Sequence, residues 1–320
     1  RGGIARAGLG YSESYVAAVL NIQEDHLGMR GIDTLDQLAE VKRIVVEVAR
    51  NTAVLNADDP LCLKMADFTK AEHLCYVTMN TGHGLVREHI RSGGRAVVLE
   101  KGINGDMITL YDNGSHIPLL WTHLVPATLE GKAMHNVQNV MFAAALAFSM
   151  GKSLEDIRHG LRTFNTTFFQ APGRMNVYDE HPFRVILDYA HNADGVRYMS
   201  DLASKLTVNG KRIVVIAGPG DRRDIDLENI ANAAAGKFDL YVLKRDDNLR
   251  GRESDEVPLH MKNTLIQAGI AENQILVIPD EVTAIDRALE LAEVDDLVII
   301  FGDAITRCWK QIIHFDGATG

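Results

Sequence analysis

Several polar residues that could bind a charged ligand follow one short apolar run in the second half of the sequence. The run Val185–Leu187 predicts a buried strand, and Asp188, His191 and Asn192 come directly after it. In an open α/β sheet, ligands bind in the crevice beyond the carboxyl ends of the strands. We therefore interpret these side chains as a candidate ligand site. An ordinary strand–turn–helix corner, in which an Asx side chain caps the helix, is the alternative interpretation.

Three further stretches carry groups of the same kind. Arg174, in the run P-G-R, could reach a phosphate with its fork of donors, or could be a solvated linker arginine. Asn136 lies near the start of an expected helix over Gly131–Met150, where backbone amides attract phosphate, or where an Asn simply caps the helix. After an expected strand over Leu240–Leu243, a charged loop could recognise a zwitterion or be merely solvated. This loop includes Asp247, Asn248 and Arg250.

Two candidates lie in the first third of the chain. His26 follows an expected strand over Tyr15–Ile22 and has an acid beside it. A lone histidine is more often structural, and a metal or phosphate role is the alternative that this position offers. Lys42 lies beside the apolar stripe of an expected helix over Thr34–Val48. A lysine in that position is otherwise an ordinary helix-surface residue.

The elements that must position these groups alternate between strand and helix, as a parallel sheet requires. Strands are expected over 15–22, 52–56 and 73–78, and Asn-Gly turns then predict antiparallel hairpins over 96–120. The stretch 165–172 breaks the periodicity and marks a domain boundary, which divides the chain into 1–168 and 169–320. Beyond it, strands expected over 185–188, 212–217, 240–243, 275–278 and 297–301 predict a doubly wound sheet of about five parallel strands.

The composition excludes several classes of function. The 320 residues carry a formal net charge of -10, which disfavours a general nucleic-acid or anionic-membrane surface. The three cysteines form no CxxC pair, so neither a disulfide framework nor a zinc site is indicated, and a reducing, cytoplasmic location is expected. No apolar run is long enough to span a bilayer. We expect no nucleic-acid partner and no membrane partner.

Seven runs in register give the chain a family resemblance. They are R-G-G-I-A-R-A-G-L, N-I-Q-E-D-H-L-G, V-L-N-A-D-D-P, A-P-G-R-M-N, D-Y-A-H-N, G-P-G-D-R-R-D and D-D-N-L-R-G-R. With them the sequence resembles the Mur-type ATP-dependent amide ligases, and among these the C-terminal half of the cyanophycin synthetases, over essentially its whole length. The resemblance implies an α/β chain. Its first part, 1–168, would be an incomplete Mur ligase central ATPase-type domain, and 169–320 a Rossmann-like doubly wound C-terminal domain.

The resemblance also implies a reaction. L-arginine would be added to side-chain carboxylates of a poly-aspartate chain, the backbone of cyanophycin, with ATP and Mg²⁺ as cofactors and in a homo-oligomer. ATP would convert the carboxylate into an acyl phosphate, which the arginine amine attacks to form an isopeptide bond. A second type of the enzyme, which joins aspartyl-arginine dipeptides, is an alternative. An inactive Mur-like scaffold module is another. A nicotinamide enzyme is disfavoured because no G-x-G-x-x-G follows a strand.

Residue roles follow from the same resemblance, position by position. His26 matches a Mg²⁺-binding histidine, and Lys42 matches a lysine that is carbamylated in many of these ligases and could then hold a second Mg²⁺. Together with Arg174 these two residues are the implied catalytic set. The implied ATP contacts are Asn136, on the adenine side, and Arg174, Asp188, His191 and Asn192. The implied amino-acid contacts are Asp247, Asn248 and Arg250, with Asp303 a candidate for reading the guanidinium.

The sequence departs from the family pattern in two ways. Ala193 stands where the family's D-Y-A-H-N-P has proline, which leaves this turn less rigid. The P-loop G-T-N-G-K-T, the glutamate before R-G-G and the ATP-grasp half that adds aspartate are not in the sequence. Because a P-loop supplies most contacts to a triphosphate, we expect this chain by itself to bind ATP weakly and to be inactive.

Overall fold

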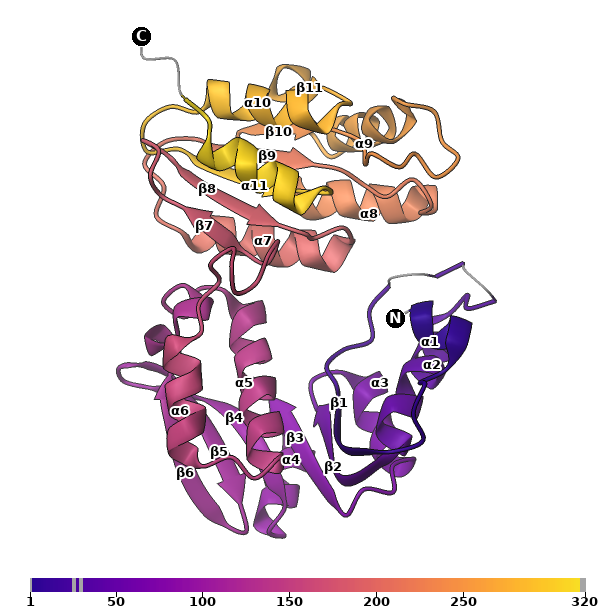
Figure 1. Cartoon of the computed structure of the whole chain (residues 1–320), viewed down its shortest axis with the longest axis vertical. Helices are drawn as coiled ribbons and strands as arrows, with labels where there is room; N and C mark the ends of the chain where they lie inside the picture. Colours follow the sequence, from indigo (N-terminus) through magenta and orange to yellow (C-terminus); the bar gives the residue numbers. More distant parts are fainter. Residues whose placement is uncertain (1, 25–26, 29–30, 317–320) are drawn as a thin grey trace. The chain divides into compact units, whose positions relative to one another are not determined.

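The structure is a computed structural model that describes residues 2–24, 27–28 and 31–316. Contacts within it divide the chain into two compact units, Arg1–Phe164 and Asn165–Gly320. Each unit has its own sheet and its own helices (Figure 1).

The first unit is built on a sheet in the order β1-β2-β3-β4-β5-β6. Strands β1 to β4 run parallel, and β5 and β6 continue the same sheet as antiparallel neighbours. The strands are β1 (Ser14–Val19), β2 (Ala49–Asn56), β3 (His73–Thr78), β4 (Arg95–Gly102), β5 (Gly105–Asp112) and β6 (Ser115–Trp121). The helices are α1 (Gly2–Ala7), α2 (Leu35–Glu47), α3 (Pro60–Leu63), α4 (Gly84–Arg91), α5 (Met134–Ser149) and α6 (Leu154–Thr163), with short 3-10 helices η1 (Lys64–Asp67), η2 (Thr122–Leu124) and η3 (Pro126–Thr128).

Both faces of this sheet are covered by helices (Figure 1). Successive side chains of a strand point to opposite faces, so in β2 Ala53 and Leu55 join one core and Val54 joins the other. Helices α2, α3 and α4 cover the face of Leu55, and α5 and α6 cover the face of Val54. Burial on both faces explains why Ala53, Val54 and Leu55 are apolar without alternating with polar residues.

Local signals in the sequence account for several element ends. Thr34 caps α2 by accepting from the Gln37 amide at 3.2 Å, and the Gln37 side chain accepts in return from the Thr34 amide at 3.1 Å, which completes a capping box. Ser153 caps α6 in the expected way. Asn113 and Gly114 both have positive φ, as the predicted two-residue hairpin turn between β5 and β6 requires.

The second unit has a sheet in the order β11-β10-β9-β12-β8-β7, in which β7 alone pairs antiparallel. Its strands are β7 (Asn176–Tyr178), β8 (Arg184–Asp188), β9 (Arg212–Ile216), β10 (Leu240–Leu243), β11 (Ile275–Val277) and β12 (Leu297–Phe301). Its helices are α7 (Ala193–Lys205), α8 (Asp224–Ala234), α9 (Glu256–Gln267), α10 (Glu281–Leu291) and α11 (Ile305–Ile313), with the 3-10 turn η4 (Glu272–Gln274). The predicted doubly wound sheet is confirmed, with β7 as an additional edge strand.

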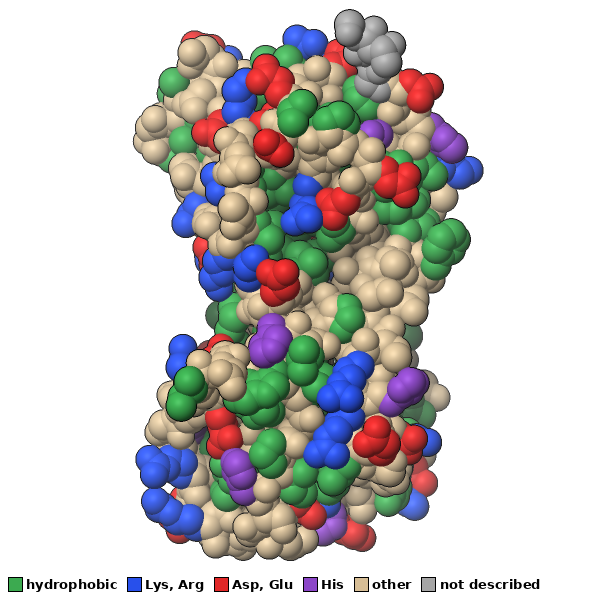
Figure 2. Space-filling model, turned by 90° about the vertical axis from the view of Figure 1, so that its left-hand side faces the viewer, with side chains coloured by type: hydrophobic (Ala, Val, Ile, Leu, Met, Phe, Trp, Pro, Cys, Tyr) green, Lys and Arg blue, Asp and Glu red, His purple; other side chains and the backbone are tan. Residues whose placement is uncertain are grey.

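The surface and the cysteines add two observations. Figure 2 shows acidic, basic and apolar side chains interspersed over the face that it presents. Cys62, Cys75 and Cys308 are all buried, and none of them forms a disulfide. Within the described residues, every helix is too short or too polar to cross a lipid bilayer.

One buried side chain, that of Asn176, anchors the segment that precedes β7. Asn176 is fully buried, and its Oδ1 accepts from the Gly173 amide at 2.7 Å. Its Nδ2 donates to the carbonyls of Thr166 and Ala171, at 2.8 and 2.9 Å. Gly173 has a φ of +68°, and a side chain there would collide with Ile305. The Asn176 side chain therefore ties three backbone groups, those of Thr166, Ala171 and Gly173, to the start of β7.

We expect Asn176→Ala to destabilise the second unit by about 2–4 kcal/mol, because it leaves buried backbone groups without partners. Hydrogen exchange at the Gly173 amide and urea unfolding measure the effect. Asn263→Ala, an exposed change on α9, is the matched control. Unchanged protection of the Gly173 amide in Asn176→Ala would contradict this account of the turn.

Candidate functional site

Asp188, at the carboxyl end of β8, fixes two loops in the second unit. One carboxylate oxygen accepts from the Met175 amide at 2.9 Å, and the other accepts from the Ala190 amide at 2.8 Å. Burial raises the pKa of Asp188, although these two amides and the nearby Arg174 favour its charged form. Asp188 thus joins the turn of Arg174 to the loop that begins α7.

The other candidate residues near Asp188, which are Arg174, His191 and Asn192, differ in their exposure and in their hydrogen-bond partners. Arg174 is exposed, and its guanidinium carbon lies 5.7 Å from the centre of the Tyr189 ring. His191 Nδ1 donates to the Tyr189 carbonyl at 2.9 Å, which in the neutral ring leaves Nε2 as an acceptor. Asn192 caps α7 by accepting from the Gly195 amide at 2.8 Å. The motif therefore includes one exposed cation, one ring acceptor and a helix cap.

Two loops that the sequence presents separately are bound to each other. They are the G-P-G-D-R-R-D loop, 218–224, and the D-D-N-L-R-G-R loop, 246–252. Arg250 donates to Asp221 at 2.8 Å, and Arg252 donates to the Gly220 carbonyl at 3.0 Å and to Asp224 at 2.8 Å. A Cβ on Gly220 would lie 2.2 Å from the Leu249 carbonyl oxygen. This close approach explains why glycine is needed there.

The predicted amino-acid contacts lie on the second of these loops. Both oxygens of Asp247 accept from the Arg307 guanidinium, at 2.8 and 3.0 Å, in a bidentate pair. The Asp247 amide donates to Asp303 at 3.0 Å. Asn248 accepts from the Arg250 amide at 3.1 Å, and Arg250 has a φ of +49°. The structure therefore gathers Asp247, Asn248, Arg250 and Asp303 into one region.

A buried ion pair lies beneath this region. Lys244 and Glu281 are both fully buried, and Lys244 Nζ lies 2.9 Å from Glu281 Oε2. Glu281 also accepts from the amides of Asp303 and Ala304, at 2.8 and 3.1 Å, and from Arg307 at 2.6 Å. Burial would raise the pKa of Glu281, but Lys244 and these donors outweigh it and lower that pKa to about 2.

The first unit carries fewer of the predicted residues in the described part. Lys42 Nζ donates to the Asn21 carbonyl at 3.3 Å, beyond the end of β1. Asn136 Nδ2 donates to the Ala127 carbonyl at 2.7 Å, and its Oδ1 accepts from Asn139 at 3.2 Å. The helices of Lys42 and Asn136, α2 and α5, pack on opposite faces of the sheet. His26 lies outside the described residues.

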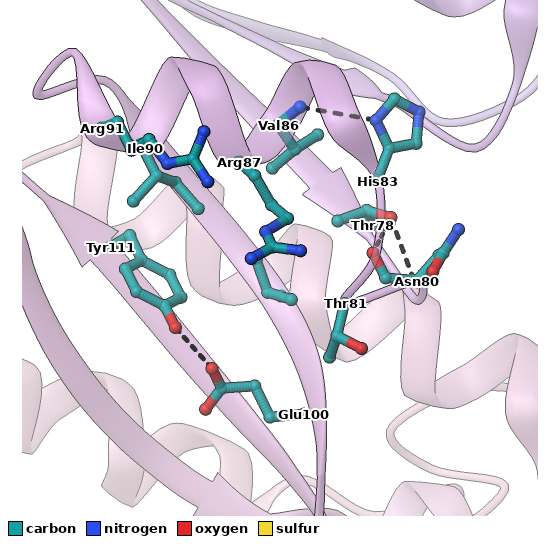
Figure 3. A pocket seen from close by; sticks show the side chains of 11 residues that line it. Thr78, Asn80, Thr81, His83, Val86, Arg87, Ile90, Arg91, Glu100 and Tyr111 are labelled. Atoms are coloured by element: carbon teal, nitrogen blue, oxygen red, sulfur yellow. Dashed lines mark hydrogen bonds between the residues drawn. The ribbon is translucent and has the colours of Figure 1, made fainter.

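The same unit has a pocket that contains none of the predicted residues. It has a volume of about 460 Å³ and lies between α4 and the strands β4 and β5 (Figure 3). Arg87 comes from α4, Glu100 from β4 and Tyr111 from β5.

Two known protein families match the chain, one in each unit. Residues 5–147 match the family described as Mur ligase middle domain, and residues 173–304 match the family described as Mur ligase, glutamate ligase domain. Each match spans the sheet of one unit. The chain belongs to the Mur ligase family.

This Mur ligase chain is similar to curated cyanophycin synthetases. The one from Synechocystis sp. is 38% identical over 315 residues, which are 98% of this chain and 35% of that protein. The one from Trichormus variabilis is 39% identical over an alignment of 322 positions, which covers 98% of this chain and 34% of that protein. The chain thus spans about a third of the length of these relatives.

A solved structure shares the Mur ligase fold. It is a bifunctional folylpolyglutamate synthase/dihydrofolate synthase from Yersinia pestis, complexed with AMPPNP and a Mn ion. The TM-score is 0.65 at 22% sequence identity, and the match covers 95% of this chain and 62% of that one. This likeness supports the fold.

The sequence analysis missed the residues that hold loop 246–252 of this Mur ligase chain in place. Lys244 follows β10 and resembles a solvated charge in the sequence. Glu281 begins α10 and Arg307 lies in the first turn of α11, both far along the chain. Their only sequence signal is the pairing of a lysine after β10 with an acid at the start of α10. A single sequence cannot distinguish this pairing from ordinary surface charges.

The Glu281 carboxylate makes the second unit sensitive to acid. Its pKa is lower in the folded protein, about 2, than the ordinary 4.5. Glu281 therefore stabilises the fold above about pH 4.5, and this contribution, on the order of 3 kcal/mol, is lost as the pH falls towards 2. We expect Glu281→Gln to lower stability at pH 7 by about 3–5 kcal/mol, because Lys244 stays buried without its anion.

Urea unfolding followed by Trp309 fluorescence, in a Trp121→Phe background, reports on the second unit alone. Between pH 7 and pH 3 the parent should lose more stability than Glu281→Gln does. Glu290→Gln, an exposed change on the same helix, should behave like the parent. Parallel pH curves for the parent and Glu281→Gln would refute the assignment.

Proposed function

We propose that the protein to which this chain belongs is an ATP-dependent amide ligase that adds L-arginine to side-chain carboxylates of poly-aspartate. A carboxylate cannot lose oxide to an amine, and ATP would supply a phosphoryl group that makes the oxygen a leaving group. The arginine amine would attack the acyl phosphate, lose a proton and expel phosphate. The new bond is an isopeptide bond, the linkage of cyanophycin.

The similarity to cyanophycin synthetases, which extends over 98% of the chain, supports this proposal most directly. The loops at the carboxyl ends of β8, β9 and β10 are also where an open α/β sheet binds ligands. We further propose the division into domains 1–168 and 169–320, a cytoplasmic location and a homo-oligomeric assembly.

In the second unit, each proposed residue has a feature that suits its role. Arg174 presents a forked cation for phosphate, and its turn is fixed by Asp188. His191 could accept a hydrogen bond at Nε2, and Asn192 orients its loop through the α7 cap. Asp247, Asn248 and Arg250 would bind the amino acid, although Asp247 already pairs with Arg307. An incoming guanidinium would therefore compete with Arg307.

In the first unit, Asn136 would contact the adenine, because its side-chain amide offers both a donor and an acceptor for a purine edge. For Mg²⁺, the described residues alone do not suffice. They contain no cluster of three or more His, Cys, Asp or Glu side chains that could hold a metal ion, and the ammonium of an unmodified Lys42 is not a metal ligand. Carbamylation of Lys42, and a metal role for His26, stay proposals.

An assay with radiolabelled arginine separates the alternatives. The protein as its gene encodes it is given ATP, a poly-aspartate primer and labelled L-arginine, or a labelled aspartyl-arginine dipeptide. Incorporation of free arginine supports the proposal, and incorporation of the dipeptide alone supports the second type. If neither compound is incorporated in an ATP-dependent manner, the result would favour the alternative of an inactive Mur-like scaffold module.

Arg174 tests the nucleotide side of the proposed site. If it contacts phosphate mainly as charge moves in the transition state, Arg174→Ala should lower kcat at least about tenfold, which is about 1.4 kcal/mol, with a smaller effect on the KM for arginine. Arg174→Lys should restore part of the rate, because lysine keeps the charge and loses the fork. Arg287→Ala, an exposed change on α10, is the control. A raised KM with unchanged kcat would assign Arg174 to the amino-acid pocket instead.

Lys42 tests the proposed carbamate. Lys42→Ala should strongly lower the rate in the same assay, and a small added carboxylate such as acetate should restore part of it by replacing the carbamate anion. Lys70→Ala, a change at another lysine of the first unit outside the proposed site, is the control. Parent rates in Lys42→Ala would show that Lys42 only covers the surface of α2.

A further inference from the structure

The pocket of the first unit carries opposite charges on facing walls. Its α4 wall includes Arg87 and Arg91, and its strand wall includes Glu100 and Tyr111. Figure 3 shows Arg87 extending from α4 towards the strand that carries Glu100. No ion pair joins Arg87 to Glu100 in the described structure. A ligand between the walls would therefore meet a cation and an anion at once.

The two arginines of the α4 wall differ. Arg91 lies 3.2 Å from Glu88 in an exposed ion pair. The Arg87 side chain is exposed, and its guanidinium forms neither a hydrogen bond nor an ion pair with any described residue. All five donors of the Arg87 guanidinium are thus available, and a guanidinium binds a carboxylate in a bidentate manner.

The anionic wall is preorganised. The Glu100 carboxylate accepts from Tyr111 at 2.5 Å, from Thr109 at 2.7 Å and from His116 at 3.0 Å. Partial burial opposes ionisation, but these donors prevail and lower the pKa of Glu100. Oε2 takes two of the donors and Oε1 takes one, so Oε1 has a lone pair left for a cationic ligand group.

The floor between the charged walls is apolar. It is formed by Val86, Ile90 and Val98, of which Val86 and Val98 are buried. An aliphatic stem would remove this surface from water. A simple anion such as phosphate would gain nothing from the floor and would be repelled by Glu100.

We propose that this pocket binds an amino acid whose carboxylate and cationic side-chain head are separated by an aliphatic stem. The carboxylate would lie on Arg87, the stem on the apolar floor and the head on Glu100. Identifying the ligand as arginine rests on the proposed function. The same chemistry is present in free L-arginine and in an aspartyl-arginine unit of the polymer. The pocket would therefore hold a substrate or a product segment on residues of the first unit alone.

The isoleucine Cδ1 methyl resonances of the 320-residue chain provide a local readout, because Ile90 lines the pocket. We expect titration with L-arginine to shift the Ile90 methyl to saturation. L-citrulline lacks the cationic head and agmatine lacks the carboxylate, so each should bind at least about fivefold more weakly. A β-aspartyl-arginine dipeptide that binds more tightly than arginine would assign the pocket to the polymer, and the reverse order would assign it to the free amino acid.

Arg87→Gln and Glu100→Gln should each weaken the Ile90 response to arginine at least about fivefold. Arg162→Gln, an exposed change on α6, should not alter it. Arg87→Gln breaks no contact within the described structure, so it tests the pocket even if Glu100→Gln disturbs the sheet. An unmoved Ile90 methyl, or equal binding of citrulline or agmatine, overturns the proposal. An inactive ligase with an intact Ile90 response would reject only the proposed function.

Discussion

The burial of Glu281 is the constraint on which the loop region of the second unit depends. A buried carboxylate without partners would be too costly to keep ionised. Glu281 is ionised because Lys244, Arg307 and two backbone amides converge on it from the end of β10, the loop after β12 and the start of α11. Arg307 then extends to Asp247. The position of the proposed amino-acid loop is therefore set by a charge beneath it.

The sequence predicted most of the fold because most elements have strong local signals. Thr34 and Ser153 cap the starts of α2 and α6, and apolar runs of three to six residues match most of the strands. The elements it missed have weak signals. β7 has three residues, too few for a period, and α4 is a polar helix whose cap is a histidine, His83. In both cases tertiary pairing and packing decide the structure.

The candidate site was predicted less completely. Motifs placed Asp188, Asn192 and Asp247 after strands, and the structure has them there. No motif specifies which group each side chain binds. The Asp188 carboxylate accepts hydrogen bonds from two backbone amides, and the Asp247 carboxylate accepts from Arg307. Such contacts depend on chain segments up to 60 residues away and cannot be inferred from local spacing.

The topology explains how the first unit could present groups from both faces of its sheet to one ligand. β6 runs parallel to β4, because two successive antiparallel pairings restore the strand direction. α5 follows β6 through η2 and η3, so its first turn, with Asn136, starts at the carboxyl edge of the sheet. Lys42 lies on α2, which covers the opposite face of the sheet from α5. Its Nζ donates to the Asn21 carbonyl beyond the end of β1, at the same edge of the sheet. A ligand over that edge could meet both side chains, whereas a ligand on either face of the sheet could meet only one.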